Sequence, residues 1–196
     1  MSLFQKEDLK IYKRTIRLGL PIIGQELVNS AVNLIDTIMI GKLGNNEVNA
    51  VGAGNEIFFL FALMVFGVVS GSSAYMGQFW GKKDVKNLHK TMGLSVIFSY
   101  VAVLIFIIPS QLIPEKLIGF YLKDPAVIEL GASYLRISSL TFLCIAISST
   151  LNGSLKAIGQ TKLPMYTTGI ALTINATLNF VFIFVLRMGV VVAAIA

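Results

Sequence analysis

The chain has 196 residues, of which 55% are hydrophobic and only 13% are charged, and its formal net charge is +6. This composition, with its strongly positive mean hydropathy, excludes an ordinary soluble domain and a disordered chain. The apolar residues come in blocks of about 20, the length that crosses roughly 30 Å of hydrocarbon. We therefore expect an all-α, polytopic membrane helix bundle. A single cysteine, Cys144, excludes a disulfide framework within the chain.

Five complete membrane spans are predicted, in the order 17–41, 57–79, 92–114, 133–155 and 165–187. A basic arm, residues 1–16, precedes them. The first span is too long and too polar for a cleaved signal peptide, so we expect the arm to be retained. Residues 189–196 predict the start of a sixth span, and we expect a chain that is truncated within that helix. The membrane lobe is thus predicted to cover residues 17–196.

Lysine and arginine concentrate in three segments, residues 6–17, 82–90 and 156–162, which share one side of the membrane if all spans cross. The connections on the other side hold most of the acidic residues. The positive-inside rule then places the N-terminus in the cytoplasm. We expect a multi-pass protein of the cell membrane, with the bacterial inner membrane as its location. Because the lysines lie between spans, the positive charge indicates topology, and we expect no nucleic-acid partner.

The first predicted span carries a polar stripe. At 100° per residue, Gln25, Asn29 and Asp36 fall within about 40°, and Asn33 and Glu26 extend the arc to about 100°. A carboxylate that faces lipid costs at least ~2.5–3.5 kcal/mol, so the stripe should face protein or water. A carboxyl group in a desolvated site favours its neutral form, so a proton, Na⁺ or a cationic substrate can compete for Asp36. The alternative for each of Asp36 and Glu26 is a permanently protonated, structural acid.

Two later spans have weaker polar faces. In the fifth, Thr168, Asn175 and Asn179 lie within about 40° of one another. In the fourth, polar residues recur at intervals of three, four and seven: Tyr134, Ser138, Thr141, Ser148 and Asn152. Such residues can serve only as interhelical hydrogen-bonding groups worth about 0.6 kcal/mol each. Taken together with the carboxylates of the first span, they favour a bundle around an aqueous cavity.

Four segments of the chain resemble one transporter family. Pro21 precedes Asp36 by fifteen positions in a helix that contains "NLIDTIMIGKLG", and the loop after the second span reads "GQFWGKKD". The fourth span begins near "YLRISSL" and leads into "NGSLKAIGQTKLPM". These residues resemble the multidrug and toxic compound extrusion (MATE) family. The resemblance implies the N-terminal lobe of a transporter that has two six-helix lobes and a central cavity, with a C-terminal lobe as the missing partner.

The resemblance also implies roles for single residues. Asp36 matches the family's cation-coupling carboxylate, Asn175 the neighbouring asparagine of the fifth helix, and Tyr134 a tyrosine near the same pocket. Asn179 stands where one branch of the family has a second aspartate, which leaves the coupling ion open. The predicted coupling residues are Asp36, Asn175, Asn179 and Asn33, with Na⁺ at Asp36 and Asn175 as the metal alternative. The predicted cavity residues are Tyr134, Gln25, Glu26, Asn29 and Thr168.

The implied function is an antiporter that exports organic cations or other amphipathic drugs in exchange for H⁺ or Na⁺, with no cofactor besides the coupling ion. Two alternatives remain open: a membrane fragment that does not transport, and a flippase-type exporter of lipid-linked substrates. An intramembrane enzyme is not expected, because the spans offer no paired catalytic acids and no serine–histidine couple. The predicted interaction partners are the lipid bilayer and small, cationic organic substrates.

Overall fold

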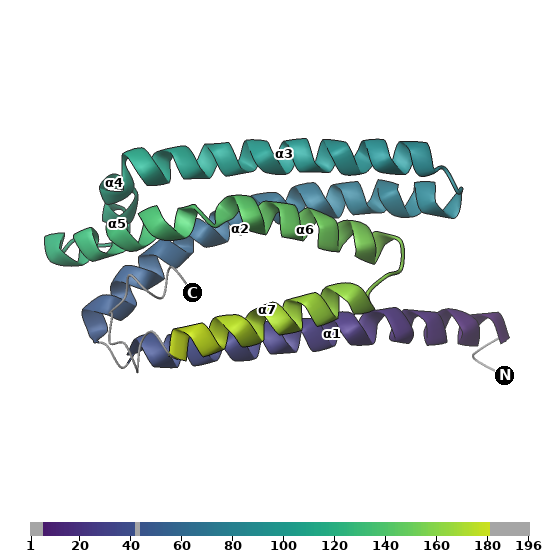
Figure 1. The fold of residues 1–196 in the computed structure, drawn as a ribbon, viewed down its shortest axis with the longest axis horizontal. Coiled ribbons are helices and arrows are strands. Elements are labelled where there is room, and N and C mark those ends of the chain that lie inside the picture. The colour runs from purple at the N-terminus through teal and green to yellow at the C-terminus, as the bar shows by residue number, and fades with distance from the viewer. Residues whose placement is uncertain (1–5, 42–43, 181–196) are drawn as a thin grey trace.

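A computed structural model describes residues 6–41 and 44–180, and this part of the chain is helical and contains no strand. Figure 1 shows its helices, which follow one another as α1 (Lys6–Gly41), α2 (Asn45–Gly81), α3 (Val85–Leu112), α4 (Pro114–Gly119), α5 (Pro125–Ser139), α6 (Phe142–Ala157) and α7 (Lys162–Phe180). The predicted all-α class is confirmed. The predicted partial span at 189–196 lies outside the described residues.

The helices form two groups. In the first, α2 packs against α3, α5 and α6, and in the second, α1 packs mainly against α7 (Figure 1). The helices α1 and α7 run in the same direction. The start of α1, the α2–α3 turn and the α6–α7 connection lie at one end of the molecule. The three basic segments of the sequence therefore gather at that end.

A bent pair of helices replaces the uninterrupted span predicted at 133–155. The axes of α5 and α6 differ by 48° across a break at Leu140 and Thr141. At the break, the N–H groups of Leu140 and Thr141 bond to carbonyls three residues back, at Ile137 and Ser138. The hydroxyl group of Thr141 also donates to the carbonyl of Ser138 at 2.7 Å. Side-chain hydroxyls that bond to helix carbonyls in this way bend helices.

The bend leaves the carbonyl of Arg136 without a helical partner from Leu140, whose N–H bonds to Ile137 instead. Two side chains donate to this carbonyl instead. Nε2 of Gln111, on α3, lies 2.7 Å from it and 2.8 Å from Oγ of Ser139, and the hydroxyl group of Ser139 donates to the same carbonyl at 3.0 Å. Because an unpaired carbonyl within a membrane costs several kcal/mol, these contacts make the bend tolerable in lipid.

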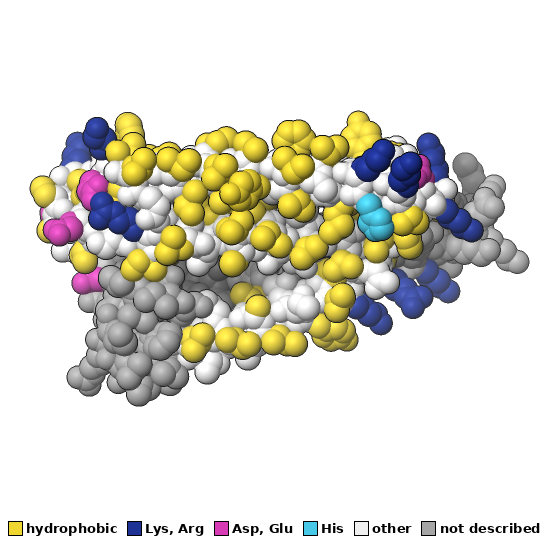
Figure 2. Space-filling model, turned by 45° about the horizontal axis from the view of Figure 1, so that its top comes forward, with side chains coloured by type: hydrophobic (Ala, Val, Ile, Leu, Met, Phe, Trp, Pro, Cys, Tyr) yellow, Lys and Arg dark blue, Asp and Glu magenta, His cyan; other side chains and the backbone are white. Residues whose placement is uncertain are grey.

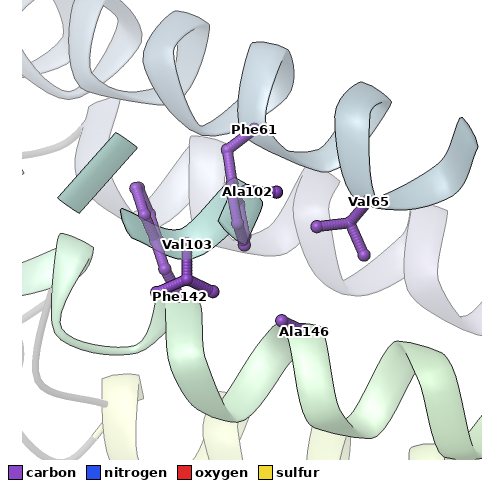
Figure 3. Close-up of a cluster of buried hydrophobic side chains, with 6 residues drawn as sticks. All are labelled: Phe61, Val65, Ala102, Val103, Phe142 and Ala146. Carbon is purple, nitrogen blue, oxygen red and sulfur yellow. The ribbon is translucent and has the colours of Figure 1, made fainter. Parts of the chain in front are cut away.

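The hydrophobic core lies where α2, α3 and α6 meet. Its fully buried members, shown in Figure 3, are Phe61, Val65, Ala102, Val103, Phe142 and Ala146. A second cluster, of Ala53, Ile57, Ile118 and Leu135, packs the short α4 against α2 and α5. The two clusters make α2 the helix around which α3 to α6 are arranged.

Glycine permits a close approach between α2 and α5. A Cβ atom at Gly54 would lie 2.6 Å from Cδ1 of Tyr134, and one at Gly131 would lie 3.2 Å from the carbonyl oxygen of Ala50. Neither position has room for a larger side chain without movement of its neighbour. These two glycines therefore set the distance between α2 and α5.

The surface agrees with a membrane location. Figure 2 shows hydrophobic side chains over the middle of the molecule and charged side chains toward its two ends. By length and composition, α2 and α3 can each cross a membrane, and α5 with α6 can do so if the bent pair is one span. The helices α1 and α7 cover most of the segments predicted as the first and fifth spans. That they cross the membrane remains a prediction.

Candidate functional site

A cavity of about 590 Å³ lies between α1 on one side and α2 and α6 on the other. It extends from Ala62, near the middle of α2, to Lys156 and Ala157 at the end of α6. We call it the interhelical cavity. Its remaining apolar lining consists of Val65, Phe66, Val69 and Ile145, with Gly153 beside them. A wall of this kind suits the apolar part of a small molecule.

Polar side chains enter the interhelical cavity from all three helices. They are Gln25 and Glu26 on α1, Ser70 and Ser73 on α2, and Ser149, Asn152 and Lys156 on α6. A carboxylate on α1 and an ammonium group on α6 thus share one cavity with amide and hydroxyl groups. This set can accept and donate hydrogen bonds and can pair with charges of either sign. Within the described residues, no three side chains of His, Cys, Asp or Glu gather into a metal site.

Gln25 connects the two helices of the second group. Its side chain is buried at the cavity wall, and its Nε2 donates to Oγ1 of Thr168, on α7, at 2.8 Å. Both residues were predicted from the sequence as cavity residues, and the structure brings them together. The close approach of the α1 backbone to α7 at this level is also seen at Gly24, where a Cβ atom would lie 4.0 Å from Sδ of Met165.

Glu26 and Asn29, which follow Gln25 on α1, form a longer hydrogen bond. Nδ2 of Asn29 lies 3.4 Å from a carboxylate oxygen of Glu26, and the Glu26 side chain is exposed. Glu26 lines the interhelical cavity, as predicted, whereas Asn29 is not among its lining residues. The loose contact leaves the carboxylate of Glu26 able to pair with a cation.

Tyr134 lies away from the interhelical cavity. It packs on Gly54 near the start of α2, and its hydroxyl group donates to Oδ1 of Asn55 at 3.2 Å. The sequence predicted it as a cavity residue, but the lining of this cavity comes from α1, α2 and α6 only. The break between α5 and α6 separates Tyr134 from Asn152, although both belong to one stripe in the sequence.

The predicted coupling residues are described less completely. Asn33 and Asp36 belong to α1 and Asn179 to α7, but their side chains lie outside the described part of the structure. Asn175 is half-buried on α7 and takes part in an interaction there. The coupling role of all four residues remains a prediction.

The residues predicted to line the cavity did not include Ser70 and Ser73 on α2 or Ser149, Asn152 and Lys156 on α6. Asn152 was recognised only as part of the polar face of the fourth span, and Lys156 only as part of a basic segment. For the three residues on α6, the spacing of three and four residues was the available signal, because it places them on one face of the helix. Arg136, the cation of α5, pairs with Glu115 at 2.8 Å on the surface.

The helix order and this cavity can be compared with known proteins. The model of the family described as MatE matches residues 21–181 of the chain. The chain belongs to the MatE family. The match to MatE covers α2 to α7 completely and α1 from Pro21 onward.

Curated MatE relatives are longer than this chain. A probable multidrug resistance protein NorM from Agrobacterium fabrum is 25% identical over 175 residues, which are 88% of the chain but 37% of the relative. The probable multidrug resistance protein YoeA from Bacillus subtilis is 27% identical over 180 residues, 89% of the chain and 38% of the relative. The chain thus spans about two-fifths of the length of these relatives.

Solved MATE structures share the fold. A crystal structure of MATE in complex with MaD5 matches 93% of the chain and 42% of that protein, with a TM-score of 0.87 and 24% identity. An outward-facing MATE transporter of the MOP superfamily matches the same share of the chain with a TM-score of 0.86 and 24% identity. The fold predicted from the sequence motifs is therefore confirmed at the level of the family.

Proposed function

We propose that the chain is the N-terminal lobe of a secondary transporter that exports organic cations or other amphipathic drugs in exchange for H⁺ or Na⁺. Membership of the MatE family and the names of the multidrug resistance relatives support this proposal. The proposed location is the bacterial inner membrane, with the N-terminus in the cytoplasm. A C-terminal lobe is the proposed partner, because the relatives are more than twice as long as the matched region.

The alignment of α1 with α7 is the main structural support for the proposed ion coupling. The Gln25–Thr168 hydrogen bond pairs residues 143 positions apart on two helices that run in the same direction. Each helix rises about 1.5 Å per residue, so the same offset brings Asp36 to the level of Asn179 and leaves Asn175 one turn away. This register supports a coupling site that contains Asp36, Asn175 and Asn179.

The proposed chemistry of coupling follows from the residue types. A carboxyl group between helices can exchange a proton when its charged form is poorly solvated. Amide oxygens of asparagine accept a hydrogen bond from the protonated acid or coordinate Na⁺, and the amide N–H groups donate to the ionised acid. The site then has two states: an ionised carboxylate, and a carboxyl group neutralised by a bound proton or Na⁺. A transporter can couple these states to two arrangements of its helices.

The test is transport in proteoliposomes that contain the complete transporter, driven by an imposed pH or Na⁺ gradient. Asp36→Asn preserves shape and hydrogen bonding but removes the titratable charge, so we expect normal insertion and no gradient-driven export. Asn175→Ala should weaken coupling in the same direction, since it removes one hydrogen-bonding partner of Asp36 at a cost of about 1–3 kcal/mol. Glu26→Gln is the matched control for a carboxylate on the same helix and should affect the rate less. Export by Asp36→Asn at the wild-type rate would show that the aspartate is structural.

One observation favours a second function, the flippase-type export of lipid-linked substrates. Lys156 places an ammonium group in the interhelical cavity, where it could pair with a phosphate group. Lys156→Met distinguishes the two functions in the same proteoliposomes. Export of organic cations should be unchanged or faster, whereas movement of an anionic lipid between leaflets should be lost if that is the function.

A further inference from the structure

Gln25 has one hydrogen-bonding atom that the described structure leaves unpaired. Its side chain is 6% exposed, and its Nε2 is bonded to Thr168, but its Oε1 is buried and has no partner among the described residues. Buried side-chain acceptors are paired in the large majority of cases, so this atom calls for an explanation. Exchanging the two amide atoms does not remove the problem, because Thr168 would then satisfy Oε1 and leave Nε2 unpaired.

The position of Gln25 indicates which kind of group would donate a hydrogen bond to Oε1. Gln25 lines the interhelical cavity, and the terminal torsion of a glutamine side chain is broad, so its amide group can turn Oε1 from its buried position toward the cavity. The same rotation carries Nε2 away from Thr168, so a ligand that bonds to Oε1 replaces that hydrogen bond. A donor inside the cavity would then meet Oε1. Lys156 lines the same cavity, yet its ammonium group makes no bond to Oε1 in this structure.

The neighbouring groups define the chemistry of such a donor. Glu26 follows Gln25 on α1 and presents an exposed carboxylate to the cavity, with only the 3.4 Å contact from Asn29. A carboxylate and an unpaired amide oxygen that line one cavity match a cation that also carries an N–H group. The apolar lining from Val65 and Phe66 matches the hydrocarbon part of the same molecule.

We propose that the interhelical cavity selects protonated amines over quaternary ammonium ions, with Oε1 of Gln25 as the acceptor of the N–H and Glu26 as the counter-charge. This inference rests on the proposed function, since it concerns the compounds that the transporter would bind. A quaternary ammonium ion satisfies the carboxylate but leaves Oε1 unpaired. Sites built to hydrogen-bond a ligand group reject analogues that lack it much more strongly than apolar pockets reject a missing methylene.

Water is the competing donor for Oε1. The cavity is large enough to hold several water molecules, and one of them could donate to Gln25 as well as an amine does. If a water molecule that stays in the cavity donates a hydrogen bond to Oε1, a protonated amine and its quaternary analogue should bind equally. The relative affinity of the two probes therefore decides between the two accounts.

The experiment measures equilibrium binding to the purified protein in lipid nanodiscs, without any ion gradient. The probes are a tertiary amine dye, at a pH two units below its own pKa, and its N-methylated quaternary derivative. We expect the wild-type protein to bind the amine about tenfold more tightly than the quaternary ion. Gln25→Met, which keeps the length of the side chain, should reduce this ratio to about one. Thr168→Val is the matched control, because it breaks the link to α7 but keeps Oε1, and it should preserve the ratio.

Glu26→Gln should weaken binding of both probes by a similar factor and leave their ratio unchanged. Equal binding of the two probes to the wild-type protein would overturn the inference, as would a tenfold ratio that survives Gln25→Met. The wild-type ratio is decisive even if a variant fails to fold. Binding of neither probe would also overturn the inference, but it would not affect ion coupling at Asp36, which the gradient-driven transport of Asp36→Asn tests separately.

Discussion

The rings of Phe61 and Phe142 are stacked, with centroids 4.4 Å apart and planes at 8°. Phe61 lies on α2, and Phe142 is the first residue of α6, directly after the break. Both side chains are fully buried. The stack therefore fixes where α6 begins on the surface of α2, and with it the side of the interhelical cavity that α6 provides (Figure 3).

Removing this stack should destabilise the bundle. Phe→Ala changes in the cores of soluble proteins cost about 3–5 kcal/mol. In a membrane protein the side chain that loses its packing meets lipid and not water, so we expect Phe142→Ala to cost about 3 kcal/mol, the lower end of this range. Denaturation of the purified protein by increasing SDS in mixed micelles measures this free energy. Leu143→Ala is the control, since the next side chain is exposed and should change stability little. Equal losses for the two variants would contradict a specific role for the stack.

Gly54 should not tolerate a methyl group, because its Cβ atom would collide with the ring of Tyr134. We expect Gly54→Ala to displace Tyr134, to break its hydrogen bond to Asn55 and to lower the temperature of unfolding. Gly52→Ala, two residues earlier on α2, is the matched control: a Cβ atom there meets nothing within 4 Å. Helix propensity alone favours alanine over glycine by about 1 kcal/mol, so Gly52→Ala should be neutral or stabilising. A stabilising Gly54→Ala would refute the close packing of α2 and α5.

The start of α3 should depend on pH through Asp84. Its carboxylate accepts from the backbone N–H of Asn87 at 3.1 Å and from Nδ2 of the same residue at 2.7 Å. The backbone hydrogen bond, followed by the side-chain one, lowers the pKa of Asp84 below its ordinary value of 3.8. A lowered pKa in the folded state means that the cap stabilises the helix fully above about pH 4 and is lost as the pH falls through the lowered value.

Hydrogen exchange at the N–H of Asn87 measures this effect locally. We expect the protection of this N–H to fall on acidification below pH 4 in the wild-type protein. In Asp84→Asn, which keeps an acceptor oxygen but cannot titrate, protection should be lower at neutral pH and should not change over the same range. An identical pH profile in the two proteins would show that Asp84 does not cap α3 through its charge.

The orientation in the membrane can be tested by labelling single cysteines in a Cys144→Ser background. The α2–α3 turn and the α6–α7 connection are predicted to be cytoplasmic, so cysteines at positions 83 and 162 should not react with an impermeant maleimide outside intact cells. A cysteine at position 123, between α4 and α5 at the other end of the molecule, should react. Labelling at 83 or 162 without permeabilisation would reverse the proposed orientation.

Much of the fold could be predicted from local sequence. The apolar blocks located α1 to α3 and α7, and the polar faces of α1 and α7 included Gln25 and Thr168, which bond to each other. The break after Leu140 could not be predicted in the same way. Part of its hydrogen bonding comes from Gln111, which is 25 residues before Arg136 and reaches it only once α3 and α5 have packed together.

The break also explains why the polar stripe predicted for the fourth span does not face a single cavity. A stripe extended from Tyr134 through Ser148 to Asn152 assumes one continuous helix. The 48° bend and the three-residue hydrogen bonds at Leu140 and Thr141 change the direction and the phase of the helix. Consequently Asn152 lines the interhelical cavity, whereas Tyr134 does not. The phase of a helix after such a bend depends on its packing partners, here Phe61 on α2.

The bent pair has a consequence for insertion of the chain during synthesis. The helix α5 has 15 residues and α6 has 16, and each is shorter than the roughly 20 residues that cross a bilayer. Neither half can remain across the membrane by itself, and the carbonyl freed at the bend bonds to Gln111 from an earlier helix as well as to Ser139 from its own. Since α2 and α3 leave the ribosome first, they can receive this segment as it enters the bilayer. The order of synthesis thus matches the order of assembly that the bend requires.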